Sequence, residues 1–141
     1  MTISPFGHIG KSPVLCFPQP MRRVRHLDRV GLHLRVVLDG AVAMGPGKVE
    51  LLEAIAETGS IAAAGRRMGM SYKRAWLLVE QMNAMFTSPL VGAAKGGAGG
   101  GGATLTPLGQ RMLTAYRDLE AAAAKAGARE LAAMRRALAH H

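Results

Sequence analysis

The stretch that decides the fold is SIAAAGRRMGMSYKRAW, residues 60–76. An alanine-rich segment follows Ser60, Gly69 interrupts it, and a second segment starts at Ser71 with basic and aromatic residues in its first turns. Serine is a preferred N-cap of helices, and glycine tolerates the backbone conformation that a tight turn requires. Two short helices joined through a glycine predict a helix-turn-helix.

The position of Gly69 in the turn predicts which side chains of the motif are buried. The inward positions hold only apolar residues, namely Met68, Met70, Ala75 and Leu78. Polar, basic and aromatic residues occupy the outer side of the second helix, together with Leu77. In helix-turn-helix proteins, the N-terminal residues of this helix enter the major groove of DNA. The residues predicted to bind DNA are Ser60, Arg66, Arg67, Ser71, Tyr72, Lys73, Arg74, Trp76 and Lys95.

Several of these residues also suit a structural role. Ser60 and Ser71 can each serve as the N-cap of the helix that follows, and Tyr72 can be a packing aromatic. For Trp76, a core position and a DNA contact are equally open. The two arginines at positions 66 and 67 are expected to meet phosphates, which would add affinity without sequence information.

The charge of the chain favours a polyanionic partner. The sequence holds 18 Lys and Arg against 9 Asp and Glu, a formal net charge of +9. No acidic residue lies between Glu57 and Glu80, whereas Glu50, Glu53 and Glu57 sit together just before this stretch. Such a separation suits one face turned to phosphates. Double-stranded DNA is favoured over a membrane, because no stretch reaches the roughly 18 apolar residues of a transmembrane helix.

Other signals narrow the function classes. The single cysteine, Cys16, excludes an internal disulfide and fits a reducing compartment. The N-terminus lacks the pattern of a secretion signal, so a cytoplasmic location is expected. The histidines show no ligand spacing, and no Ser/His/Asp set is present. We therefore predict a protein that is not an enzyme, with no catalytic residues, no cofactor and no metal site.

Three regions are expected along the chain. Residues 1–30 combine four prolines with a basic run from Met21 and predict a disordered tail; Met21 is also an alternative start of translation. Residues 31–105 hold the helix-turn-helix, preceded by a strand and a helix. The strand alternates apolar residues up to an Asp39-Gly40 turn, and the helix runs from Pro46 to Gly59. The inward residues are Leu32, Leu34, Val36 and Leu38 in the strand, and Val49, Leu52, Ile55 and Ala56 in the helix.

The segment after the helix-turn-helix predicts a wing and a long helix. A glycine tract at 94–102 separates short strands at 90–93 and 103–105, which is typical of a hairpin tip that carries Lys95. A nucleotide-binding loop is disfavoured, because no Gly-Lys-Ser/Thr follows the glycines. Residues 106–141 predict a helix from Pro107 towards Leu138 that can bend at 126–128. Its apolar stripe predicts a homodimer through this helix.

Two runs carry a family resemblance: ETGSIAAAGRRMGMSYKRAW…EQMN at 57–83 and KGGAGGGGATLTPLGQRML at 95–113. Together they resemble the DNA-binding half of ModE-type molybdate-responsive transcriptional regulators and, more distantly, the LysR-type winged helix. The resemblance implies an α+β, mainly helical, winged helix-turn-helix fold with a long C-terminal dimerisation helix. It also implies transcriptional control of molybdenum-related operons. By the same resemblance, DNA is read by Ser71, Tyr72, Lys73 and Arg74, with Lys95 in the wing.

The chain departs from this family at its C-terminal end. Full-length members bind molybdate in a separate C-terminal module of small β-barrels, and no strand-rich segment follows Leu105. We therefore expect no molybdate site in this chain. The alternative hypothesis is a protein–protein interaction module that is built on a winged helix and does not bind DNA.

Overall fold

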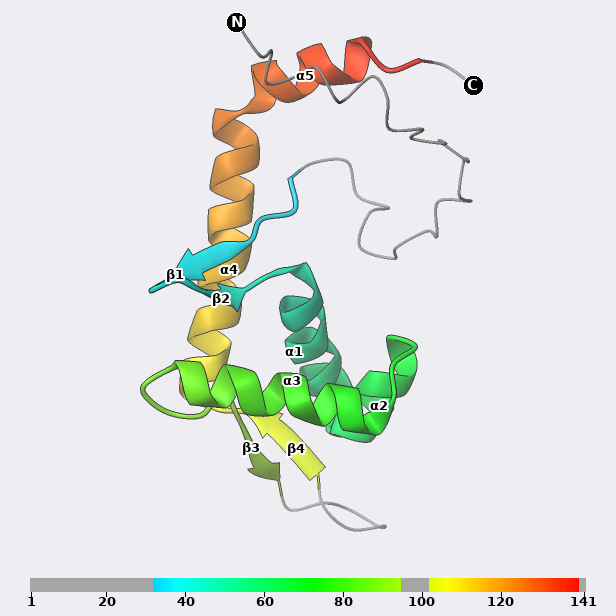
Figure 1. The fold of residues 1–141 in the computed structure, drawn as a ribbon, viewed down its shortest axis with the longest axis vertical. Helices are drawn as coiled ribbons and strands as arrows, with labels where there is room; N and C mark the ends of the chain where they lie inside the picture. Colours follow the sequence, from blue (N-terminus) through cyan, green and yellow to red (C-terminus); the bar gives the residue numbers. More distant parts are fainter. Residues whose placement is uncertain (1–31, 95–101, 140–141) are drawn as a thin grey trace, which may run out of the picture.

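A computed structural model describes residues 32–94 and 102–139 of the chain, so the predictions for the N-terminal tail and for Lys95 lie outside the described residues. The fold is α+β and mainly helical, as predicted (Figure 1). Its elements are β1 (Val36–Leu38), β2 (Ala41–Met44), α1 (Pro46–Thr58), α2 (Ile61–Arg67), α3 (Tyr72–Met85), β3 (Val91–Ala94), β4 (Gly102–Leu105), α4 (Pro107–Ala126) and α5 (Ala128–Arg136).

Helix α1 lies at the centre of the core. It starts at Pro46, where the missing N–H of proline costs no hydrogen bond, and it ends at Gly59 in the left-handed conformation with φ 68°. Helices α2, α3 and α4 and strand β4 all pack against α1. Residues Leu51 and Ala54 are therefore buried along with the predicted stripe, whereas Ala56, which was predicted to be inward, is exposed.

The first hairpin is shorter than the alternating pattern predicts. Strand β1 covers only Val36–Leu38, and it pairs with β2 through the two-residue turn Asp39-Gly40. Both turn residues have positive φ, 49° and 78°, as a type I′ hairpin turn requires. The prediction that Leu38 points inward is wrong, because Leu38 is 52% exposed at the hairpin end. Leu38 lies next to the turn of the hairpin, where no other element of the described residues covers it fully.

Residue Tyr116 of α4 ties the segment before β1 to the rest of the fold. Its hydroxyl donates a hydrogen bond of 2.6 Å to the carbonyl oxygen of Leu34. Burial raises the pKa of the Tyr116 hydroxyl, and the negative charge of Glu120 adds to the effect. The hydroxyl therefore keeps its proton, and with it this long-range hydrogen bond, to higher pH than an exposed tyrosine would.

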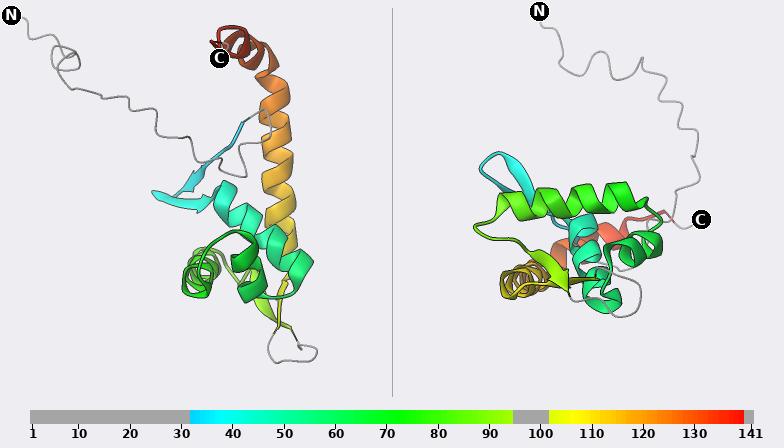
Figure 2. Two further views of the ribbon diagram at one scale, coloured as in Figure 1. Left: turned by 90° about the vertical axis from the view of Figure 1, so that its right-hand side faces the viewer. Right: turned by 90° about the horizontal axis from the view of Figure 1, so that it is seen from below.

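Strands β3 and β4 form the predicted wing. They pair antiparallel with Val91 opposite Leu105 and Ala94 opposite Gly102. Strand β3 is shifted by one residue from its predicted bounds, and β4 starts one residue earlier than predicted. The wing projects beyond one end of α4, and α5 lies at the other end (Figures 1 and 2). Helix α3 runs across the direction of α4, beside the wing.

The C-terminal segment consists of two helices. Helix α4 ends at Ala126 and α5 begins at Ala128, so the division falls where the sequence predicted a bend. Figure 2 shows that α5 turns away from the axis of α4. Helix α5 contributes no buried residue. Among the helices of residues 32–94 and 102–139, none has the length and apolar character needed to cross a membrane.

Candidate nucleic-acid interface

The turn between α2 and α3 is built as the sequence predicts. The Ser60 hydroxyl oxygen accepts a hydrogen bond of 3.1 Å from the N–H of Ala63, and the Ser71 hydroxyl accepts one of 3.2 Å from the N–H of Arg74. Between the two helices, Gly69 has a φ of 70°, which a side chain would strain. Both serines are thus N-caps that fix where their helices begin.

Small residues allow α2 and α3 to approach closely. A Cβ atom on Gly65 would lie 3.2 Å from the Cβ of Ala75. Among the four inward positions predicted for the motif, Ala75 is fully buried, and Met68, Met70 and Leu78 are half-buried and pack against the core. The predicted frame of the helix-turn-helix is therefore confirmed.

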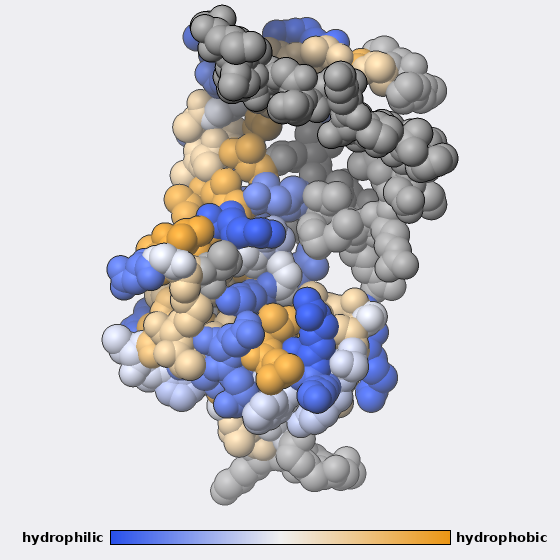
Figure 3. Space-filling model, viewed as in Figure 1, coloured by the Kyte–Doolittle hydropathy of each residue, from blue (hydrophilic) through white to orange (hydrophobic). Residues whose placement is uncertain are grey.

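The outer side of α3 carries the residues predicted to contact DNA. Residues 71–74 are all exposed, with Tyr72 at 58%. Trp76 is 43% exposed, which decides against a core position for it. In Figure 3 the surface over α3 is largely hydrophilic, with a small hydrophobic patch over the middle of the helix. The exposed start of α3 thus gathers hydroxyl, aromatic and cationic groups on one surface.

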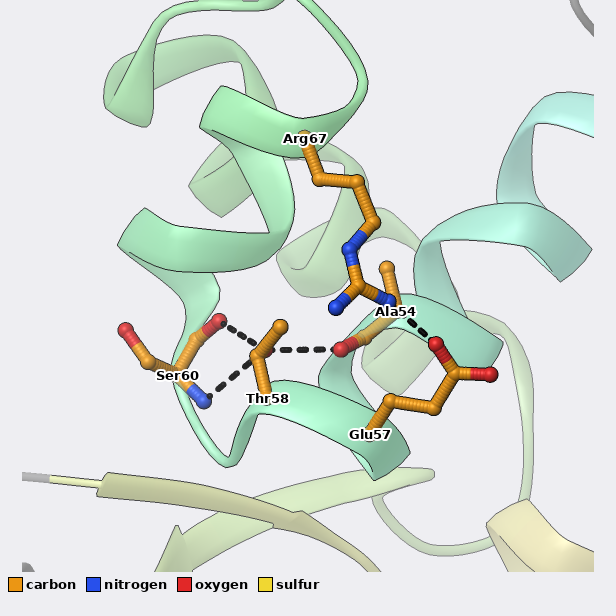
Figure 4. A network of polar contacts seen from close by, with 5 residues as sticks. All are labelled: Ala54, Glu57, Thr58, Ser60 and Arg67. Atoms are coloured by element: carbon orange, nitrogen blue, oxygen red, sulfur yellow. Dashed lines mark hydrogen bonds and ion pairs between the residues drawn. The ribbon is translucent and has the colours of Figure 1, made fainter.

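The two predicted phosphate ligands of α2 differ in their surroundings. Arg66 is exposed on the last turn of α2. Arg67 instead forms an ion pair with the carboxylate of Glu57 on α1 (Figure 4). The side chains of Arg67 and Glu57 are 46% and 67% exposed, and such exposed pairs contribute at most about 1 kcal/mol to stability. The ion pair is therefore weak enough to exchange its carboxylate for another anion.

Figure 4 also shows how the end of α1 is held beside this ion pair. The Thr58 hydroxyl donates a hydrogen bond of 2.7 Å to the carbonyl oxygen of Ala54, and it accepts one of 3.4 Å from the N–H of Ser60. These contacts join the last turn of α1 to the N-cap of α2. Arg67, at the other end of α2, reaches back to Glu57 on this turn.

Asn83 positions the wing relative to α3, a role that was not predicted. Its amide nitrogen donates to the carbonyl oxygen of Val91 at 3.1 Å, and its Oδ1 accepts from the N–H groups of Leu90 and Val91 at 2.9 and 3.1 Å. Asn83 lies four residues after the buried Val79 and one after the buried Met82. A polar residue on the inward side of an apolar stripe was the available signal, because such a group must find hydrogen-bond partners.

Arg117 of α4 fixes the helix to α1, which was also not predicted. Its guanidinium pairs with Glu53 of α1 and, at 2.9 Å, with Glu120 of α4. Desolvation lowers the pKa of Arg117, but the hydrogen bonds to Glu53 and Glu120 raise it more, so the pKa is raised overall. Glu53, one of the three acidic residues of α1, therefore joins α1 to α4.

Comparison with known proteins found a matching family model and similar solved structures. Residues 47–110 match the model of the family described as bacterial regulatory helix-turn-helix protein, lysR family. The matched segment spans α1, α2, α3, the wing and the start of α4. A solved structure described as the CbnR DBD–DNA complex resembles 62% of this chain and 95% of that chain, with 25% identity and a TM-score of 0.49.

Three of the curated relatives found by sequence illustrate the similarity. The molybdenum-pterin-binding protein MopB of Rhodobacter capsulatus is 52% identical over 91 residues, 64% of this chain and 34% of MopB. The molybdenum transport protein ModE of Azotobacter vinelandii is 39% identical over 100 residues, 71% of this chain and 36% of that protein. The DNA-binding transcriptional dual regulator ModE of Escherichia coli K12 is 45% identical over 71 residues, 50% of this chain and 27% of that protein.

The chain thus spans about a third of the length of the curated relatives it matches. The match to the family model includes the helix-turn-helix that the structure displays. Residues 47–110 thus match the LysR family of helix-turn-helix proteins, and the chain is similar in sequence to the ModE and Mop proteins.

Proposed function

We propose that this protein is a sequence-specific, DNA-binding transcriptional regulator of the ModE type. The observation that carries the proposal is the exposed start of α3 within a segment that matches the LysR family. The Ser71 hydroxyl is engaged as a cap, which leaves Tyr72, Lys73 and Arg74 exposed beside it. In the major groove, a lysine there can donate to the O6 and N7 atoms of guanine, and Arg66 supports the complex by contacting phosphate.

The change Lys73→Ala tests the sequence-specific part of this function. On the tightest duplex selected from a random pool, we expect it to weaken binding by about 1–3 kcal/mol, because one base-edge contact is lost. On an unrelated duplex the loss should be smaller, since only the general charge attraction is reduced. Fluorescence anisotropy at fixed salt measures both affinities. Equal weakening on both duplexes would make Lys73 a phosphate ligand.

The same titration tests whether the protein binds DNA at all. A DNA-binding protein that neutralises several phosphates loses affinity steeply as salt rises. We expect this dependence for the wild-type protein on any duplex. Absence of binding to every duplex at low salt would contradict the proposal and would favour the protein–protein module instead.

We further propose that the protein is a homodimer held by α4 and α5. Exposed apolar side chains occur on α4, on α5 and just after α5, with Leu119 at 47%, Met134 at 68% and Leu138 at 65% exposure. Burying these side chains against a second copy removes apolar surface from water, and a two-fold dimer suits two half-sites on DNA. Sedimentation equilibrium should give twice the mass of one 14.8 kDa chain at micromolar concentration. A single-chain mass at that concentration would contradict the dimer.

We also propose that the two parts of the chain have separate roles. Residues 31–105 act as the DNA-binding unit, and residues 106–141 act as the dimerisation segment. The protein acts by binding DNA in the cytoplasm, without catalysing a reaction. We also propose that the 141 residues hold no molybdate site, so added molybdate should leave their DNA affinity unchanged.

A further inference from the structure

Leu77 is an apolar residue at the outermost position of α3. It lies two residues after Ala75 and two before Val79, which are both buried. At about 100° of rotation per residue, a separation of two residues places Leu77 on the side of the helix away from the core. Leu77 is accordingly 44% exposed. It makes no contribution to the core that would explain a leucine at this position.

The surroundings of Leu77 are polar and basic. Lys73 and Gln81 lie one turn before and one turn after it on the same side of α3, and both are exposed. Arg74 is exposed on the adjoining turn. Glu80, which is exposed one turn after Leu77, is the one acidic residue of α3, so the two basic residues outnumber it. This composition agrees with Figure 3, where a small hydrophobic patch over α3 is surrounded by hydrophilic residues. A partner that fits the surface must combine negative charge with an accessible apolar group.

The major groove of DNA has this combination. Phosphates line it on both sides, and the 5-methyl group of thymine is the apolar group that projects into it. Trp76 is less well placed for this contact. It lies one residue, or about 100°, round the helix from Leu77, towards the side on which Asn83 holds the wing. Of Trp76 and Leu77, it is therefore Leu77 whose side chain points more directly away from the core of the protein.

We propose that Leu77 contacts the 5-methyl group of a thymine in the major groove and so determines a preference for thymine at one position of each half-site. The inference rests on the proposed DNA-binding function and adds a residue that determines specificity. The contact is apolar, so it discriminates thymine from cytosine and uracil by a methyl group that those bases lack.

Replacement of thymine by deoxyuridine tests the contact, because this removes the methyl group and leaves the base-pairing edge intact. The probe is the tightest duplex selected from a random pool, synthesised with each thymine replaced in turn. We expect one position per half-site at which deoxyuridine weakens wild-type binding about fourfold, the factor that corresponds to removing one buried methyl-sized group. For Leu77→Ala, the same replacement should have no effect.

Met85→Ala is the matched control, since Met85 is also an exposed apolar residue of α3, at 37% exposure, but lies at the far end of the helix. This variant should keep the fourfold effect of deoxyuridine. Circular dichroism should show that both variants remain folded, because both replace exposed residues with the best helix former. The inference is overturned if no thymine position responds, or if the response is the same in Leu77→Ala. Failure of the wild-type protein to bind any duplex would instead overturn the proposed function.

Discussion

Gly109→Ala is expected to lower the free energy of unfolding by about 3 kcal/mol, because the new methyl group has no space. A Cβ atom at this position would lie 2.1 Å from the carbonyl oxygen of Leu90 and 3.0 Å from its carbonyl carbon. These are backbone atoms, and the same oxygen accepts a hydrogen bond of 2.9 Å from the N–H of Thr106. The start of α4 must therefore move away from the wing, and urea denaturation measures the cost.

Gly47→Ala is the control for Gly109→Ala. Gly47 lies in the first turn of α1, and a Cβ atom built there meets nothing within 4 Å. Alanine should therefore be neutral there or should stabilise the protein by up to about 1 kcal/mol, because it restricts the unfolded chain. If both variants unfold at the same urea concentration as the wild type, α4 does not pack on Leu90 as closely as the structure shows.

Asn83→Ala is expected to cost about 2–4 kcal/mol of stability. The change removes all three hydrogen bonds between α3 and the start of the wing, and it leaves the N–H groups of Leu90 and Val91 without acceptors. Both residues are buried, so water cannot easily replace the lost partner. Because Asn83 also fixes the wing beside α3, DNA affinity should fall even at temperatures where the variant is folded. Thermal unfolding and anisotropy titration measure the two effects.

Two further variants show whether the hydrogen bonds cause this loss. Asn83→Asp keeps an acceptor for the two N–H groups and loses only the donor to the Val91 carbonyl oxygen, so its stability should be intermediate. Gln81→Ala changes an exposed residue of the same helix and should stay within about 0.5 kcal/mol of the wild type. Equal destabilisation by the alanine changes at positions 81 and 83 would assign the effect to the helix rather than to the wing.

The local signals in the sequence predicted the central motif well. The N-caps at Ser60 and Ser71, the turn at Gly69 and the buried Ala75 all depend on residues near one another in the chain. The 3.6-residue period and the preference of serine for N-caps act over one or two helical turns. They can therefore be recognised before the fold is known.

Features that depend on distant residues were not predicted. The sequence pattern placed Leu38 inward, but only the length and position of the hairpin determine that it is exposed. Two contacts join separate elements, namely Asn83 with Val91 and Arg117 with Glu53. The sequence alone does not show how these elements are placed relative to one another. The roles predicted for Lys73, Arg74 and the other outer residues of α3 remain predictions until DNA binding is measured.

The ion pair between Arg67 and Glu57 has a consequence for how DNA contacts are counted. When an arginine neutralises a phosphate, the cations condensed around that phosphate enter the solution, and the salt dependence of affinity records their release. A phosphate that takes Arg67 from Glu57 displaces a carboxylate that stays attached to the protein. A salt titration would still count this phosphate, because its cations are released, but the contact replaces an existing ion pair and so adds less affinity than the count suggests.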